Sequence, residues 1–241
     1  MTDLTNKIAV VTGASSGIGA AIVKEFLASG MKVVGLARRK EKVEQLGEGY
    51  EGCLFALETD ISKDEDILSA FAWTLENVGP VDVLINNAGI NVSKAIEDAE
   101  VEEFKNVIST NLLGAMLCTR EAIKIMKAHD IAGTIVNISS VAGDVVCAIP
   151  CISLYTASKN GLRGFNDYIR TELAKTGSKI RITNLSPGLV ATEMAAPYME
   201  GRNFIRVEDI AAGVKFVVSQ PGNVNHIEYQ NTVSNFYIFC T

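Results

Sequence analysis

Tyr155 and Lys159, four residues apart, are the pair of side chains in this sequence best suited to acid–base chemistry. Residues four apart on a helix share one face, about one turn from each other. A free phenol has a pKa of about 10, and an ammonium group within about 4–6 Å favours the phenolate and lowers that pKa. The pair could therefore give or take a proton on an alcohol or a carbonyl. The spacing alone also fits an exposed aromatic beside a solvated lysine, so other parts of the chain must decide.

A glycine-rich stretch follows the first apolar run of the chain. The run at 7–11 suits a buried strand, and residues 20–29 have the pattern of a helix. A loop between them could turn tightly and bring its backbone close to a pyrophosphate at the helix N-terminus. Its candidate cofactor-binding residues are Gly13, Ser15, Ser16, Gly17, Ile18 and Gly19. The loop could instead be a simple turn that links strand to helix.

The end of the next predicted strand, 32–36, bears on the choice of cofactor. Proteins that prefer NAD usually carry an Asp or Glu about 20 residues after the glycine loop. Here the sequence has Arg38, Arg39 and Lys40 instead. The guanidinium groups of Arg38 and Arg39 could hold a 2′-phosphate in bidentate fashion, which favours NADP, with NAD as the weaker alternative. These residues could also be the solvated start of the next helix.

Short β-branched runs alternate with helical patterns along the chain, which is typical of a parallel sheet with crossover helices. We predict a single domain over 1–241, a doubly wound (Rossmann) α/β fold of about seven strands with helices on both faces. The placeable strands are 7–11, 32–36, 52–57, 81–85, 133–140 and 179–185, and the helices are 20–29, 64–78, 102–130, 153–175 and 207–219. The last strand should follow His226, where the pattern is too weak to place it. Residues 193–206 are the predicted substrate loop.

Ligands of such sheets bind at the carboxyl ends of the strands. The candidate residues at these ends are Asp60, Ile61, Asn87, Ala88, Gly89, Ser139 and Ser140. The stretch 86–89 could equally be a turn, and adjacent strand residues face opposite ways, so geometry does not choose between the two serines. Asn111, among apolar residues of a helix, could kink that helix, serve as a buried structural amide or hold a catalytic water.

Composition excludes several classes of protein. With 241 residues, 48% hydrophobic and 21% charged, the chain is an ordinary globular protein. The net charge of −6 argues against a nucleic-acid or anionic-membrane partner. Because the start lacks signal-peptide features and no apolar run could span a bilayer, we expect a cytoplasmic protein without a membrane span. The five cysteines should be reduced thiols, and His129 and His226 suggest neither a metal site nor a catalytic triad.

Together these motifs resemble the short-chain dehydrogenase/reductase family, in family order from about residue 7 to 220. The matching motifs are 12–19, 86–89, Asn111, 139–140, Tyr155 with Lys159, and Pro187 with Gly188. Within the family, 33–38 and 118–122 are most similar to an NADP-dependent branch. That branch includes the insect farnesol dehydrogenases and a related vertebrate keto-reductase.

The resemblance implies roles for these residues. Tyr155 would be the general acid/base, Lys159 would lower its pKa and hold the nicotinamide ribose, and Ser140 would bind the substrate oxygen. Asn111 would position a water behind Lys159. The implied cofactor contacts are Asp60 and Ile61 near the adenine, Asn87, Ala88 and Gly89 at the ribose, and Pro187, Gly188, Val190 and Thr192 at the carboxamide.

The implied activity is NADP(H)-dependent interconversion of an alcohol and a carbonyl by hydride transfer. The substrate would be apolar, such as a farnesol-like terpenoid alcohol, a steroid or another ketone or aldehyde. The family also implies a homodimer or homotetramer.

The sequence departs from the common family pattern in one segment, and two other functions are alternatives to the oxidoreductase. The segment between Ser140 and Tyr155 is about two residues longer than the common family spacing and contains Cys147, Pro150 and Cys151. We expect it to reshape the pocket wall. The main alternative is an NADP-binding regulatory or scaffold protein without turnover. A dehydratase or epimerase would carry a longer substrate domain after Gly188.

Overall fold

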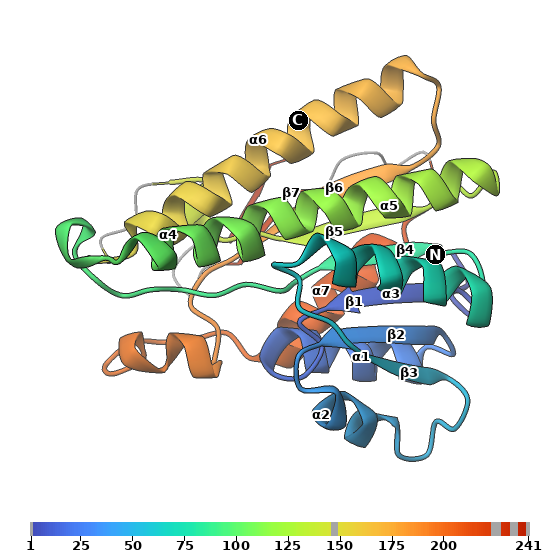
Figure 1. The fold of residues 1–241 in the computed structure, drawn as a ribbon, viewed down its shortest axis with the longest axis horizontal. Helices are drawn as coiled ribbons and strands as arrows, with labels where there is room; N and C mark the ends of the chain where they lie inside the picture. The colour runs from blue at the N-terminus through green and yellow to red at the C-terminus, as the bar shows by residue number, and fades with distance from the viewer. Residues whose placement is uncertain (1, 146–148, 223–227, 232–235, 240–241) are drawn as a thin grey trace.

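A largely parallel sheet runs through the centre of the computed structural model, which describes residues 2–145, 149–222, 228–231 and 236–239. The strand order is β3-β2-β1-β4-β5-β6-β7-β8, with β8 antiparallel to β7 and all other pairs parallel. The strands are β1 (Ile8–Thr12), β2 (Lys32–Ala37), β3 (Leu54–Glu58), β4 (Val83–Asn86), β5 (Thr134–Ile138), β6 (Arg181–Pro187), β7 (Glu228–Asn231) and β8 (Phe236–Phe239). The chain order reverses between β1 and β4, the point where open α/β sheets bind ligands (Figure 1).

Helices cover both faces of this sheet (Figure 1). One face packs against α1 (Gly17–Ala28) and α7 (Val207–Val218), and the other against α3 (Asp64–Asn77), α5 (Ala115–Ala128) and α6 (Ser153–Lys175). The short helix α2 (Lys40–Glu44) lies beside β2 and β3. Successive side chains of β1 point to opposite faces of the sheet. Val10 therefore belongs to the core under α3 and α5, and Val11 belongs to the core under α1 and α7.

The predicted doubly wound α/β fold is confirmed. The predicted positions of β1 to β6 lie within two residues of those found. The strand that could not be placed is β7, and β8 brings the described part of the sheet to eight strands, one more than the seven or so predicted. The calls on Cys147, His226 and Cys240 lie outside the described residues.

The predicted helix 102–130 is interrupted. The structure has α4 (Val101–Ile108), a π-helical turn over Ser109–Gly114, and then α5. Such π turns widen a helix locally and are frequent at functional sites. At Gly114 a Cβ would collide with the side chain and the carbonyl oxygen of Ile61, so the chains approach closely here. Asn111 lies in this turn with 1% exposure, as both the kink and the buried-amide interpretations require.

A row of buried asparagines crosses the sheet under α5 and α6. Asn86 and Asn184 are the register partners of Asn137 on either side. The Asn86 Nδ2 donates to Asn137 Oδ1 at 2.8 Å, and the Asn137 Nδ2 donates to Asn166 Oδ1 on α6 at 3.1 Å. Asn137 therefore ties β4, β5 and α6 together just below the carboxyl end of the sheet.

Replacing Asn137 with alanine should lower the free energy of unfolding by about 2–3 kcal/mol, because Asn166 Oδ1 would lose its donor in a buried place. Urea denaturation measures this change. Asn203→Ala, at an exposed asparagine, is the control and should leave the midpoint unchanged. Equal midpoints for wild type and Asn137→Ala would show that the buried amide row contributes nothing.

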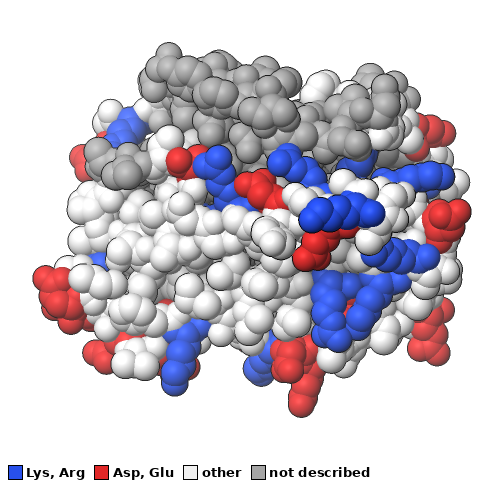
Figure 2. Space-filling view, turned by 90° about the horizontal axis from the view of Figure 1, so that it is seen from above, with Lys and Arg blue, Asp and Glu red and all other residues white. Residues whose placement is uncertain are grey.

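The surface carries charges of both signs. On the face in Figure 2, Lys and Arg lie mostly to one side with Asp and Glu among them, beside a broad uncharged area. Pairs such as Lys124 with Glu121 (2.9 Å) and Arg170 with Asp167 (3.8 Å) follow α5 and α6. Within the described residues, no helix combines the length and apolar character that a bilayer crossing requires.

Candidate active site

A cavity of about 590 Å³ opens at the carboxyl ends of the strands. This size is typical of small-ligand sites. It is lined by every cofactor-binding and catalytic residue predicted from the sequence except Gly19 and Asn111, which lie just behind its wall. Segments far apart in the sequence thus meet in one pocket, although their individual roles stay predictions.

The glycine loop is held by the end of β4. The Asn87 Nδ2 donates to the carbonyl oxygens of Thr12 (2.9 Å) and Gly13 (3.2 Å). The Thr12 hydroxyl accepts from the backbone N–H groups of Asn87 (2.9 Å) and Ala88 (3.0 Å). A Cβ at Gly19 would collide with the Gly13 carbonyl and lie 2.6 Å from Asn87 Nδ2, which explains the glycine there. The amide of Asn87 therefore braces the loop.

One end of the cavity suits an anion. Gly13 and Gly17 have φ values of 66° and 54°, a conformation that favours glycine and lets the loop turn tightly. The N-cap residue of α1, Ser16, makes no side-chain bond to the first turn, and that turn holds no acidic residue. The backbone N–H groups at this positive helix end can therefore meet a phosphate. This is the cradle that the pyrophosphate of a dinucleotide requires, so the residues fit such a cofactor.

Two arginines border the same end. Arg39 donates to the hydroxyl oxygens of Ser16 (3.1 Å) and Ser15 (3.5 Å). Arg38 is exposed at the cavity rim. Helix α2 begins at Lys40, with Arg39 as its N-cap. Arg39 therefore lies at the start of a helix and also beside the loop that is predicted to hold the phosphates.

Asp60 follows β3 at the neighbouring part of the wall. Its Oδ1 accepts from the Ser62 hydroxyl (2.7 Å) and the Ser62 backbone N–H (3.0 Å). Partial burial raises the pKa of Asp60, but these two hydrogen bonds, together with the charges of Arg38 and Lys63, outweigh that effect and lower it. The carboxylate is therefore ionised at neutral pH and available as an acceptor.

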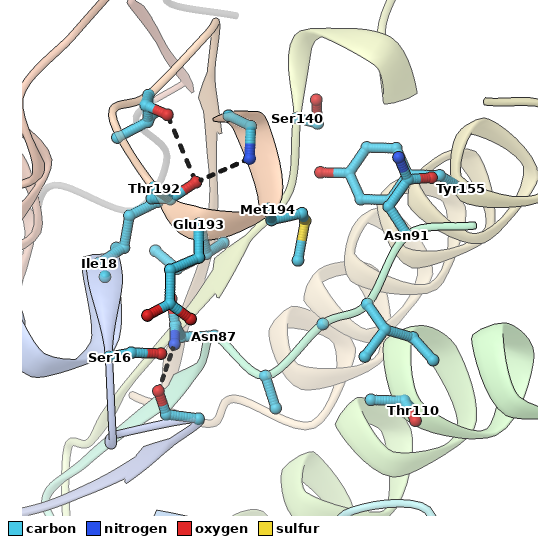
Figure 3. Close-up of a pocket in the computed structure, with 18 of the residues that line it drawn as sticks. Ser16, Ile18, Asn87, Asn91, Thr110, Ser140, Tyr155, Thr192, Glu193 and Met194 are labelled. Atoms are coloured by element: carbon cyan, nitrogen blue, oxygen red, sulfur yellow. Dashed lines mark hydrogen bonds between the residues drawn. The ribbon is translucent and has the colours of Figure 1, made fainter. Parts of the chain in front are cut away.

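The other end of the cavity holds Tyr155 and Lys159, one turn apart on α6. The Lys159 Nζ lies 5.6 Å from the centroid of the Tyr155 ring and donates to the carbonyl oxygen of Ile138 at 2.7 Å. Lys159 is 4% exposed, and the desolvation of its ammonium lowers its pKa to about 8. Figure 3 shows the Tyr155 hydroxyl directed into the pocket on the side where Ser140 lies.

The two serines at the end of β5 differ in environment. The Ser140 Oγ accepts from the Ala142 N–H at 3.2 Å, which leaves its own hydrogen free to donate. The Ser139 hydroxyl is shielded from solvent and has no partner among the described residues. Ser140 therefore has the geometry for a ligand oxygen, in line with its predicted role.

Asn111 is bound on all sides. Its Oδ1 accepts from the Ile90 N–H (2.8 Å), and its Nδ2 donates to the Ile90 carbonyl oxygen (2.9 Å) and to Ser158 Oγ (3.0 Å). Both Asn111 Oδ1 and Lys159 Nζ lie within 4 Å of the place a Cβ on Gly89 would occupy. The small space beside Gly89 could thus hold a water between them, while the amide itself clamps the loop after β4.

Several wall residues belong to no motif, although Met194 and Tyr198 lie in the predicted substrate loop and Ile149 and Ile152 in the longer 140–155 segment. They are Ile90, Asn91, Ile149, Ile152, Met194 and Tyr198. Asn91 follows a strand end and could have been found from that position, whereas Tyr198 lies in a segment without any motif. Of the longer 140–155 segment, Pro150 and Cys151 are exposed, and Ile149 and Ile152 line the cavity.

This chain is similar in sequence and in structure to known dehydrogenases. A family model described as short chain dehydrogenase matches residues 7–203. A farnesol dehydrogenase of Aedes aegypti is 41% identical over 225 residues, covering 90% of this chain and 92% of that protein. Dehydrogenase/reductase SDR family member 11 of Gallus gallus is 37% identical over 237 residues, covering 91% and 93%. An alcohol dehydrogenase from the archaeon Thermococcus sibiricus, solved with 5-hydroxy-NADP, superposes with a TM-score of 0.83 at 27% identity, covering 93% and 95%.

Proposed function

The chain belongs to the short-chain dehydrogenase family of oxidoreductases, and from that membership we propose that it interconverts an alcohol and a carbonyl with NADP(H). The observation that carries this proposal is the single cavity that joins the glycine loop to Tyr155, Lys159 and Ser140. One end holds an anion cradle and the other an acid–base pair, as hydride transfer with coupled proton transfer requires.

Each residue has a task in this proposal. Tyr155 gives a proton to the carbonyl oxygen in reduction and takes it back in oxidation. The Lys159 ammonium, fixed on Ile138, stabilises the phenolate and can hydrogen-bond a ribose. Ser140 donates to the substrate oxygen, and Asn111 holds a water beside Gly89 that carries a proton from solvent to Tyr155 in reduction and from Tyr155 to solvent in oxidation. When bound, the nicotinamide supplies or accepts the hydride.

The preference for NADP over NAD rests on the two arginines. Arg39 is already oriented by Ser15 and Ser16, and Arg38 lies at the same rim, so a 2′-phosphate would meet two guanidinium groups. The archaeal alcohol dehydrogenase solved with 5-hydroxy-NADP supports a nicotinamide cofactor. NAD lacks the 2′-phosphate and should bind more weakly.

Arg38→Ala and Arg39→Ala should each weaken NADPH binding about tenfold, and the double variant about a hundredfold, because charge-assisted bonds to the phosphate are lost. Titration of NADPH fluorescence measures the Kd, with NADH in parallel. NADH affinity should stay within about threefold. Lys42→Ala, on α2 outside the cavity wall, is the control. Equal losses for both cofactors would refute the role of the arginines.

An apolar alcohol or carbonyl compound suits the substrate end. Ile90, Ile149, Ile152 and Met194 line it. The similarity to a farnesol dehydrogenase supports a terpenoid alcohol as the first candidate, with steroids and other ketones or aldehydes next. We also propose a homodimer or homotetramer through the α4–α6 surface, where Val101 and Leu113 are 70% and 47% exposed.

The alternative function is an NADP-binding regulatory or scaffold protein without turnover. Such a protein would not need Tyr155 and Lys159 to be held in a geometry that permits proton transfer. The burial of Lys159 and its bond to Ile138 favour the enzyme.

A further inference from the structure

Residues 193–204, which we term the cover segment, form part of the cavity wall but stand out from the layered body of the protein. Glu193, Met194 and Tyr198 of this segment line the cavity. Figure 1 shows its short helix, in orange, apart from the sheet and its covering helices. Met194 is 42% exposed and Phe204 48%, so the segment buries little apolar surface of its own. Segments with few buried contacts open at low cost in free energy.

The base of the cover segment is fixed. Ile205 pairs with Val190 in an isolated parallel bridge, its N–H donates to the Leu189 carbonyl at 2.8 Å, and its carbonyl accepts from the Ala191 N–H at 2.9 Å. The Thr192 hydroxyl caps the first turn by accepting from the Ala195 N–H at 3.3 Å. The two ends of the segment therefore meet at one point, as the ends of a hinged flap do.

Its far end is held by one side chain. The Tyr198 hydroxyl accepts from Asn91 Nδ2 at 3.1 Å and is hydrogen-bonded to Ser93 Oγ, and Asn91 Nδ2 also donates to Ser93 Oγ at 3.2 Å. Among the described residues, Tyr198 makes all the hydrogen bonds that join the cover segment to the rest of the protein outside its base.

The receiving side of this contact is tied by hydrogen bonds to the π turn. Asn91 follows Ile90, whose backbone N–H and carbonyl are both clamped by Asn111, and Asn111 donates in turn to Ser158 beside Lys159. Hydrogen bonds between Ser158 on α6 and Asn111 and between Asn111 and Ile90, followed by the peptide bond to Asn91, thus connect the catalytic helix to the Tyr198 contact. Figure 3 shows Asn91 on the same side of the pocket as Tyr155.

The contact between Tyr198 and Asn91 leaves one buried polar atom without a hydrogen bond in the part of the chain that the structure describes. The Asn91 Oδ1 is shielded from solvent and has no partner among the described residues. A buried acceptor without a donor costs free energy. This cost disappears when the contact opens, because water can then donate a hydrogen bond to the acceptor. The arrangement therefore holds the segment closed but permits it to open, as entry of an apolar substrate into a covered pocket demands.

We infer that Tyr198 is a positioning residue, the latch that closes residues 193–204 over the substrate end of the cavity through Asn91 and Ser93. This inference rests on the proposed function only for its effect on turnover. The latch should retain apolar substrates by excluding water, so it acts on substrate affinity and not on the proton transfer.

Tyr198→Phe keeps the ring and removes the hydroxyl that makes both bonds. Each neutral hydrogen bond shifts an equilibrium by roughly threefold to fivefold, so the loss of both should raise the open population about tenfold or more. Trypsin cleavage after the exposed Arg202, followed by mass spectrometry, reports this opening without any need for activity. Cleavage should be about tenfold faster in Tyr198→Phe and about fivefold faster in Ser93→Ala. Tyr168→Phe, at a tyrosine 72% exposed on α6, should cleave like wild type.

Steady-state rates with farnesol give the second readout. The KM for farnesol should rise about tenfold in Tyr198→Phe, with kcat unchanged or higher and the NADPH Kd within about twofold. Unchanged cleavage after Arg202 in both Tyr198→Phe and Ser93→Ala would overturn the latch. A lower kcat at unchanged KM would overturn the positioning role. If the wild type neither binds NADPH nor turns over any substrate, the proposed function fails, and the cleavage comparison still decides on the latch.

Discussion

Replacing Tyr155 with phenylalanine should lower kcat/KM at least about a hundredfold, a loss of about 3 kcal/mol of transition-state stabilisation. The change removes one oxygen and keeps the ring that lies 5.6 Å from Lys159 Nζ. The change therefore keeps the aromatic ring in the pocket wall and removes the proton donor and acceptor. NADPH should bind within about threefold of wild type, since the anion cradle lies at the opposite end of the cavity.

Two measurements separate this chemical effect from a structural one. Steady-state kinetics give the loss in kcat/KM, and NADPH titration shows that the site is intact. Tyr168→Phe, which alters an exposed tyrosine on the same helix, should retain full activity. If Tyr155→Phe turned over within tenfold of wild type, Tyr155 would not be the general acid/base.

Replacing Lys159 with methionine should also reduce turnover at least about a hundredfold, because the phenolate loses the ammonium that stabilises it. The same variant has a signature in stability. Burial lowers the pKa of Lys159 from 10.5 to about 8, so below pH 8 the folded protein carries a charged group that prefers water. As the pH rises from 8 towards 10.5, the unfolded chain binds the extra proton, and stability increases.

The stability of wild type relative to Lys159→Met should therefore rise by about 2 kcal/mol between about pH 7.5 and 9.5. Urea unfolding of both proteins across this range measures the difference. The exposed Lys24 on α1 gives the control, since Lys24→Met should show no such trend. A difference that stays flat with pH would mean that the Lys159 ammonium is not desolvated in the folded protein.

Much of the fold and the pocket could be predicted because the relevant signals are local in the sequence. A buried strand, a glycine loop and a helix follow each other within about twenty residues, so their geometry is set by neighbours along the chain. In a parallel sheet all carboxyl ends meet at one edge. The positions of Asp60, Asn87, Ser140 and Pro187 at or just after the ends of their strands were therefore enough to place them around one cavity.

Other features depend on contacts that no local pattern records. The π turn at Ser109–Gly114 arises where Gly114 meets Ile61 and Asn111 meets Ile90, both distant in sequence. Arg39 proved to be the arginine oriented by Ser15 and Ser16, although Arg38 lies nearer the strand. Tyr198 meets Asn91 and Ser93 across more than a hundred residues of chain, and its segment lacks any periodic pattern.

The central claim is turnover with NADP(H), and the most direct test is nicotinamide absorbance during reaction of the purified protein. NADP and NAD should be compared side by side with farnesol, a hydroxysteroid and an α-dicarbonyl. The account predicts turnover of at least one of these compounds, faster with NADP(H) than with NAD(H), and its loss in Tyr155→Phe. Tight NADPH binding without turnover of any compound would contradict it and would favour a regulatory or scaffold protein.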